Sequence, residues 1–134
     1  MPTVKLVAED HPDPIVREVF ADIKATKKID FIPNIWRALA THPEHLRLCW
    51  TRLKEIMRPG KVDLLTKEIV ALAVSVTNSC RYCVNSHTAA AQKLGLTQEG
   101  LGEVLAVVGL FNQMNKLADG YQIEPDVLPG DWVQ

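Results

Sequence analysis

The stretch that decides the fold runs from Asp63 to Leu94 and reads DLLTKEIVALAVSVTNSCRYCVNSHTAAAQKL. Its first half is apolar on nearly every side of a helix, which predicts a central, buried helix. The apolar residues of this half are Leu64, Leu65, Ile69, Val70, Leu72, Ala73, Val74 and Val76. Asp63 is suited to cap this helix, and the pair Asn78-Ser79 is expected to end it. A second helix then begins near Cys80 and is closed by Gly95.

Working outward, capping residues and helix breakers predict four more helices. Their expected starts are Asp13-Pro14, Pro33-Asn34, His42-Pro43 and Thr97. No segment has the alternation of apolar and polar residues that is typical of a strand. We therefore expect an all-α fold, a single-domain helical bundle of about six helices over residues 1–134. Its core motif region covers 63–120, and an extended tail covers 121–134.

Composition excludes several classes of function. Fifteen basic residues against sixteen acidic ones leave no basic surface, so we expect no nucleic-acid partner. The first ten residues lack the features of a secretory signal, and the longest apolar stretch, 69–76, is too short to span a bilayer. We expect a cytoplasmic protein without a membrane partner. The odd count of three cysteines argues against a structural disulfide framework.

The chemistry concentrates in the C-x-x-C motif Cys80-Arg81-Tyr82-Cys83. The N-terminus of a helix favours thiolate over thiol, and two cysteines three apart near a turn can form a disulfide. His87 follows Cys83 by four residues, so the two side chains share one helix face and the imidazole can take the thiol proton. The position at the helix start favours Cys80 as the more reactive thiol, whereas the histidine spacing favours Cys83.

Glu68 lies one helix earlier, in a segment that is otherwise expected to be buried. A buried carboxylate costs several kcal/mol unless it is paired or protonated. Burial also raises the pKa of a carboxyl group toward neutrality, which suits a proton acceptor. Glu68, His87 and the two cysteines therefore suggest a proton relay ending at a dithiol. An ordinary ion pair of Glu68 with Arg52 or Arg81 is the alternative.

Other residues have simpler interpretations. Cys80, Cys83 and His87 could be three zinc ligands, but no fourth ligand has motif spacing to them. The candidates for that fourth position are His42, His45 and Cys49. Cys49 lies on an apolar helix face and is expected to act as an inert small hydrophobe. Tryptophans 36, 50 and 132 are expected to anchor a core or an interface.

The whole motif resembles the alkylhydroperoxidase AhpD-like family of the carboxymuconolactone decarboxylase superfamily. The resemblance rests on Glu68, eleven intervening residues, the C-x-x-C motif and His87. It extends to the segments 31–43 and 111–119, and so covers residues 31–120. One position differs, because Tyr82 stands where the best-known members carry a histidine. A phenol is a poor proton acceptor near neutral pH, so Tyr82 is at most an accessory residue.

The resemblance implies a thiol peroxidase. Cys83 would attack the hydroperoxide and become a sulfenic acid, Cys80 would resolve it to a disulfide, and Glu68 and His87 would move protons. It implies no bound cofactor, because the dithiol is re-reduced by an external lipoyl or thioredoxin-like donor. It also implies a homo-trimer or homo-hexamer. The apolar helices of 63–94 point to a subunit interface too, and Trp132 suggests that the tail packs across it.

Three other functions use the same residues differently. The dithiol could cycle with a protein partner as a disulfide reductase or redox carrier, with peroxide irrelevant. The chain could be a scaffold or metal-holding oligomer without peroxidase activity. It could also be a decarboxylase-type member of the superfamily, although that chemistry needs no dithiol.

Overall fold

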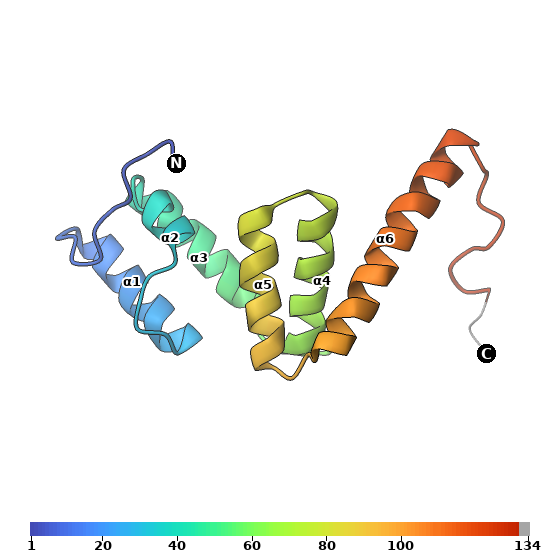
Figure 1. Ribbon diagram of the computed structural model, residues 1–134. Coiled ribbons are helices and arrows are strands. Elements are labelled where there is room, and N and C mark those ends of the chain that lie inside the picture. Colours follow the sequence, from blue (N-terminus) through green and yellow to red (C-terminus); the bar gives the residue numbers. More distant parts are fainter. Residues whose placement is uncertain (132–134) are drawn as a thin grey trace. The chain divides into compact units, whose positions relative to one another are not determined.

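The computed structural model describes residues 1–131 and is built from helices alone (Figure 1). Over these residues no strand is present, which confirms the predicted all-α fold. The helices, in chain order, are α1 (Pro14–Lys27), α2 (Asn34–Leu39), α3 (Pro43–Met57), α4 (Leu64–Thr77), α5 (Arg81–Lys93) and α6 (Gln98–Gly120).

The chain divides into two compact units. The first, Met1–Arg58, holds α1 to α3, and the second begins at Pro59 and holds α4 to α6. The boundary falls at the Pro59-Gly60 pair, shortly after the end of α3. The expectation of a single domain over residues 1–134 stays a prediction.

Hydrogen bonds of capping side chains confirm three of the predicted helix starts. Asp13 accepts from the backbone N–H groups of Ile15 and Val16, at 2.9 and 3.2 Å. Asp63 accepts from the N–H of Thr66 at 2.8 Å, and Thr97 from that of Gly100 at 3.0 Å. Each such cap satisfies a backbone donor that the helix leaves unpaired.

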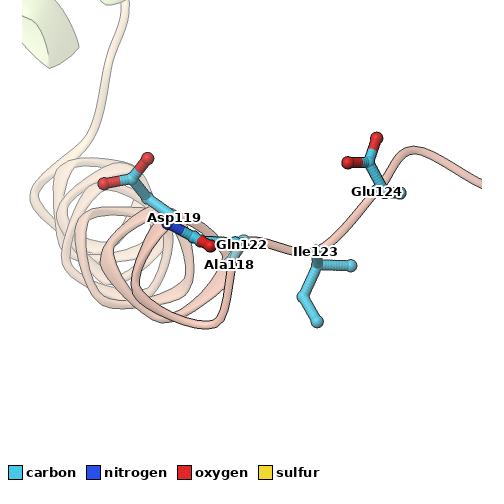
Figure 2. A pocket seen from close by; sticks show the side chains of 5 residues that line it. All are labelled: Ala118, Asp119, Gln122, Ile123 and Glu124. Carbon is cyan, nitrogen blue, oxygen red and sulfur yellow. The ribbon is translucent and has the colours of Figure 1, made fainter.

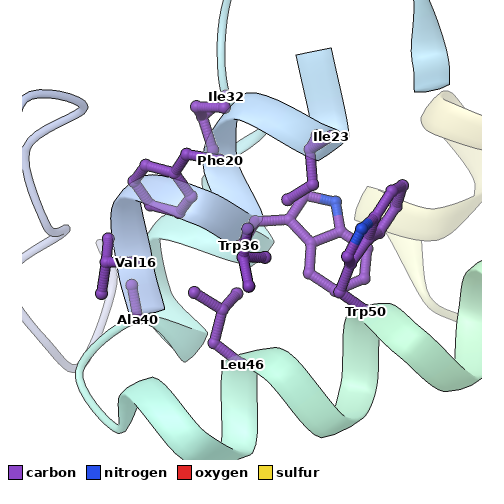
Figure 3. Close-up of a cluster of buried hydrophobic side chains, with 9 residues drawn as sticks. Val16, Phe20, Ile23, Ile32, Trp36, Ala40, Leu46 and Trp50 are labelled. Atoms are coloured by element: carbon purple, nitrogen blue, oxygen red, sulfur yellow. The ribbon is translucent and has the colours of Figure 1, made fainter. Parts of the chain in front are cut away.

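The first unit has a well-packed apolar core (Figure 3). On α1 the buried residues recur at helical spacing: Val16, Val19, Phe20 and Ile23. Trp36 of α2 and Trp50 of α3 meet edge to face, with ring centroids 5.2 Å apart and an interplanar angle of 84°. This geometry is favourable for aromatic pairs and confirms the two tryptophans as core anchors.

The second unit buries much less of its apolar surface. Its buried residues are Glu68, Leu72, Ser75, Ala91 and Val108. The prediction that the 64–77 helix is buried all round is wrong, since Val70 and Val74 are 55% and 53% exposed. Within the unit α4 packs against α5 and α6 only, so part of its circumference is left uncovered.

Much of the apolar surface of α6 is also exposed. Leu101, Val104 and Val108 are at least partly buried. Other apolar residues of the helix lie on the surface, among them Leu105, Phe111, Met114 and Leu117. After α6 the described tail, residues 121–131, contains no helix. Trp132, the predicted interface anchor, lies outside the described residues.

Among residues 1–131, no helix combines the length and the apolar character needed to cross a bilayer.

Asp22 ties α1 to α3 through one carboxylate oxygen. Its Oδ2 accepts hydrogen bonds from the indole N–H of Trp50 at 2.7 Å and from the Lys54 ammonium at 2.6 Å. Lys54 first, and Trp50 second, stabilise the ionised form, so the pKa of Asp22 is lowered from its ordinary value of 3.8. The contribution of Asp22 to stability is therefore present above pH 3.8 and is lost as the pH falls through the lowered pKa.

We expect Asp22→Asn to lower the free energy of unfolding at neutral pH by about 1 kcal/mol, because charge-assisted hydrogen bonds become neutral ones. Urea titrations at neutral and strongly acidic pH measure the difference, which should shrink in acid as the wild-type carboxyl group protonates. The control is Asp10→Asn, at an exposed position. An equal loss in the control, or a difference that is independent of pH, would contradict the assignment.

Candidate active site

The turn between α4 and α5 fixes the position of the C-x-x-C motif. Ser79 adopts a left-handed backbone with φ of 58°. Its N–H donates to the carbonyl of Val76 at 3.1 Å, and the N–H of Cys80 donates to that of Ser75 at 2.9 Å. This is the Schellman arrangement that closes a helix, with a serine at the position usually held by glycine. Cys80 is thereby placed directly at the end of α4.

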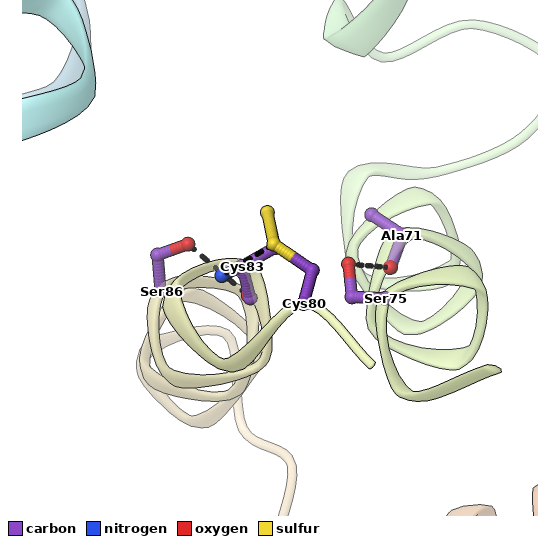
Figure 4. The surroundings of a disulfide bond; sticks show 5 residues. All are labelled: Ala71, Ser75, Cys80, Cys83 and Ser86. Atoms are coloured by element: carbon purple, nitrogen blue, oxygen red, sulfur yellow. Dashed lines mark hydrogen bonds between the residues drawn. A yellow bond between two sulfur atoms is a disulfide. The ribbon is translucent and has the colours of Figure 1, made fainter. Parts of the chain in front are cut away.

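Cys80 is also the N-cap of α5, where its sulfur accepts a hydrogen bond from the N–H of Cys83 at 3.3 Å. The two cysteines form a disulfide, with Cα atoms 5.3 Å apart (Figure 4). Both residues are partly buried. The hydroxyl of Ser86 donates to the carbonyl of Cys83 at 3.1 Å, one turn into the helix. The predicted ability of this pair to form a disulfide is confirmed.

Glu68 and His87 meet between α4 and α5. Glu68 Oε2 lies 2.7 Å from His87 Nδ1, and Glu68 is only 8% exposed. The predicted burial of this carboxylate is confirmed, and its partner is the histidine rather than Arg52 or Arg81. Glu68 shares one buried face of α4 with Leu72 and Ser75, four and seven residues further on. The spacing of Glu68, Leu72 and Ser75 can be read from the sequence and places Glu68 on this face. The direct contact with His87 cannot be read from it.

The contact determines what the imidazole can do. With Glu68 ionised, the Nδ1–H of His87 donates to the carboxylate, and Nε2 carries the lone pair. His87 follows Cys83 by one helical turn on α5 and is itself partly exposed. A histidine held in this way is equipped to accept a proton from a neighbouring thiol and to return it later.

The remaining candidate residues are Tyr82, His42 and Cys49. Tyr82 lies between the two cysteines and is 43% exposed. His42 caps α3 by accepting from the N–H of His45 at 3.2 Å, and Cys49 packs against the core of the first unit. In the part of the chain that the structure describes, no group of three or more histidine, cysteine or acidic side chains is arranged to hold a metal ion.

Two surface hollows lie in the second unit, and neither is lined by the cysteines. A hollow of about 520 Å³ at the end of α6 is lined by Ala118, Asp119, Gln122, Ile123 and Glu124 (Figure 2). A groove of about 340 Å³ lies between α4 and α6, with Val74, Phe111 and Asn112 among its lining residues. Asn112 donates to the hydroxyl of Thr77 at 3.0 Å across this groove.

Comparison with known proteins shows which family the chain belongs to. Residues 43–123 match the family model described as "Carboxymuconolactone decarboxylase family". The crystal structure of the alkylhydroperoxidase AhpD core from Rhodospirillum rubrum is 46% identical, with a TM-score of 0.90, and the match covers 94% of this chain and 95% of that one.

Two curated relatives carry different names. The alkyl hydroperoxide reductase AhpD of Streptomyces griseus is 28% identical over 106 residues, which are 76% of this chain and 59% of the relative. An (R)-2-haloacid dehalogenase of Pseudomonas putida is 28% identical over 118 residues, which are 84% of this chain and 38% of the relative. The chain thus spans less than two thirds of the length of either.

The left-handed conformation of Ser79 generates a prediction. Ser79→Gly should leave the free energy of unfolding unchanged or slightly higher, because glycine adopts this conformation without strain. Ser79→Val should lower it by about 1–2 kcal/mol, because a β-branched residue is strained there. Denaturant titration of the oxidised proteins measures both. Equal stability of the two variants would show that the turn does not depend on this conformation.

Proposed function

The chain belongs to the carboxymuconolactone decarboxylase family and has the AhpD core fold, and on this premise we propose that it is a peroxidase. It reduces hydroperoxides through a dithiol–disulfide cycle of Cys83 and Cys80, with Glu68 and His87 as the proton relay. The working group is the dithiol itself, without a bound cofactor. The electron donor is an external dithiol, of the lipoyl or thioredoxin-like kind, and the site of action is the cytoplasm.

The observation that carries the proposal is the 2.7 Å contact between Glu68 and His87, one helical turn from Cys83. A structural disulfide has no need of a carboxylate–imidazole pair beside it. Burying a carboxylate costs free energy, and buried ionisable groups are typical of sites where a proton is transferred. Reduction of a peroxide requires such movement, because a thiol must lose a proton and an alkoxide must gain one.

The first step begins from the reduced protein. His87 Nε2 takes the proton of the Cys83 thiol, and Glu68 stabilises the imidazolium that forms. The Cys83 thiolate attacks the terminal oxygen of the hydroperoxide and breaks its O–O bond. Cys83 becomes a sulfenic acid, and the leaving alkoxide takes the proton from His87 and departs as an alcohol.

The second step closes the disulfide. The Cys80 sulfur attacks the sulfur of the Cys83 sulfenic acid, and the hydroxyl group leaves as water. The balance is one hydroperoxide and two thiols converted to one alcohol, one water and one disulfide. The external dithiol then reduces the disulfide by exchange and is itself oxidised. Cys80, at the start of α5 and partly exposed, is the sulfur suited to receive that attack.

Disulfide exchange with a protein partner is the second candidate, because it needs the same accessible dithiol. Disulfide exchange would not require the Glu68–His87 pair, because a helix N-terminus by itself favours the thiolate that attacks the partner disulfide. The family also contains the relative named a haloacid dehalogenase, so membership alone does not select the peroxidase. The two experiments below distinguish these activities.

Peroxide reactivity of the two cysteines is the first prediction. Fully reduced protein treated with one equivalent of cumene hydroperoxide should consume it and lose two hydrogens in intact mass. Cys80→Ser should instead accumulate a sulfenic acid on Cys83, and Cys83→Ser should consume no peroxide above the uncatalysed rate. Peroxide that persists while the thiols stay reduced would refute the proposal and favour disulfide exchange.

The second prediction concerns the proton relay of Glu68 and His87. His87→Gln should lower the rate of peroxide reduction by a factor on the order of 100 to 1,000, the usual contribution of a general acid–base group. The rate of exchange with a small disulfide should fall much less. Gln92→His, at an exposed position of the same helix, serves as a control for changes of imidazole content. Parallel losses in both reactions would indicate a structural role for His87.

A further inference from the structure

Ser75 brings a buried hydroxyl group to the turn that holds the dithiol. The residue lies on α4 and is 8% exposed, and its hydroxyl donates to the carbonyl of Ala71 at 2.6 Å. Its own carbonyl accepts the N–H of Cys80 at 2.9 Å. Figure 4 shows the Ser75 hydroxyl on the side of α4 that faces Cys80. The proposed proton relay makes no use of this group.

Packing alone does not account for a serine at this position. An alanine would fill nearly the same space and would leave no polar atom to bury. The Ala71 carbonyl that receives the hydroxyl is already the acceptor for the backbone N–H of Ser75 in the helix, so α4 does not depend on a second donor there. The hydroxyl is therefore available to a stronger acceptor.

Reduction of the disulfide creates such an acceptor. A neutral sulfur accepts hydrogen bonds weakly, whereas a thiolate is an anion. Hydrogen bonds to an ionised acceptor are roughly twice as strong as those between neutral groups. The hydrogen of a serine hydroxyl rotates about the Cβ–Oγ bond, so it can turn away from the Ala71 carbonyl without any change in the backbone.

We propose that in the reduced protein the Ser75 hydroxyl donates to the Cys80 thiolate and stabilises it as the nucleophile that closes the disulfide. The N–H of Cys83, which donates to the Cys80 sulfur at 3.3 Å, and the N-terminal end of α5 favour the same thiolate. Ser75 adds the donor that comes from the neighbouring helix.

This inference rests on the proposed dithiol cycle and deepens its second step. The Cys80 thiolate attacks the sulfur of the Cys83 sulfenic acid, an S–S bond forms and the S–O bond breaks. The leaving hydroxide takes a proton from the solvent and becomes water. Because Cys80 is already ionised, this step does not require that the imidazole of His87 take a second proton.

The hydroxyl acts apart from the Glu68–His87 contact. Leu72, which is 0% exposed, lies between Glu68 and Ser75 on the same face of α4. The seven residues from Glu68 to Ser75 correspond to about 10 Å along the helix axis. An apolar side chain thus separates the two polar groups, and each cysteine has its own means of ionisation.

The other charged groups around Cys80 are independent of Ser75. Arg81 and Tyr82 follow Cys80 on α5, and both are exposed. The end of α4 and the turn, residues 75–79, carry no charge. The residues of α6 that line the groove beside α4 are uncharged as well. A change in the ionisation of Cys80 on substitution of Ser75 therefore reports the hydroxyl itself.

Alkylation of Cys80 tests the hydrogen bond without peroxide. In the Cys83→Ser protein, the rate of reaction of Cys80 with iodoacetamide is measured as a function of pH, and peptide masses separate Cys80 from Cys49. Ser75→Ala should raise the pH of half-maximal rate by about one unit and slow alkylation at neutral pH by about tenfold, because the thiolate loses a charge-assisted hydrogen bond. The maximal rate at high pH should stay the same.

Ser86→Ala is the matched control. Ser86 also lies beside the disulfide and donates to a helix carbonyl, that of Cys83 at 3.1 Å, but it is exposed (Figure 4). It should leave the half-maximal pH unchanged. Ser75→Thr keeps the hydroxyl and should keep the wild-type value, which covers the case that the alanine variant fails to fold. An unchanged half-maximal pH in Ser75→Ala, an equal shift in Ser86→Ala, or a change in the maximal rate alone would overturn the inference.

A single turnover with peroxide separates this inference from the proposed function. In the chain with both cysteines, Ser75→Ala should slow disulfide closure by about tenfold and change the consumption of peroxide by less than about twofold. Dimedone should then trap the sulfenic acid on Cys83. Peroxide that persists in the wild type would overturn the proposed function and the closing step with it, whereas closure at the wild-type rate in Ser75→Ala would overturn this inference alone.

Discussion

The contact between the Glu68 carboxylate and the His87 imidazole is the constraint on which the rest of the candidate site depends. It spans 2.7 Å between two helices, and the carboxylate is nearly buried, so it fixes the register of α4 against α5. The Ser79 turn then has to close within the three residues between the helices. Because Cys80 ends that turn and caps α5, the dithiol lies where this register places it.

The features of this structure that depend on neighbouring residues in the chain were predictable from the sequence. The helix starts at Asp13, Asp63 and Thr97 follow from capping, which depends only on neighbouring residues. The candidate site was found because its cysteines and His87 lie on one helix at fixed spacing. For Glu68 the sequence left the relay with His87 and an ion pair with an arginine both open, because the choice depends on how two helices pack. Burial of Val70 and Val74 was predicted wrongly, since apolar character does not reveal how many neighbours a helix has.

The two units differ in how much of their apolar surface they bury. The first has a core of its own around Trp36 and Trp50, whereas the second holds the dithiol and leaves α6 largely uncovered. The dithiol turn is thus built on the unit that buries fewer apolar side chains.

The central claim is that the Glu68–His87 pair activates Cys83, and the most direct test is the rate at which that thiol reacts without any peroxide. In the Cys80→Ser protein, alkylation of Cys83 by iodoacetamide at neutral pH reports the fraction of reactive thiolate. Adding Glu68→Gln should slow alkylation by about tenfold or more, because the imidazolium loses its carboxylate. An alkylation rate that is unchanged by Glu68→Gln would contradict the account, since the pair would then serve the packing of α4 on α5 alone.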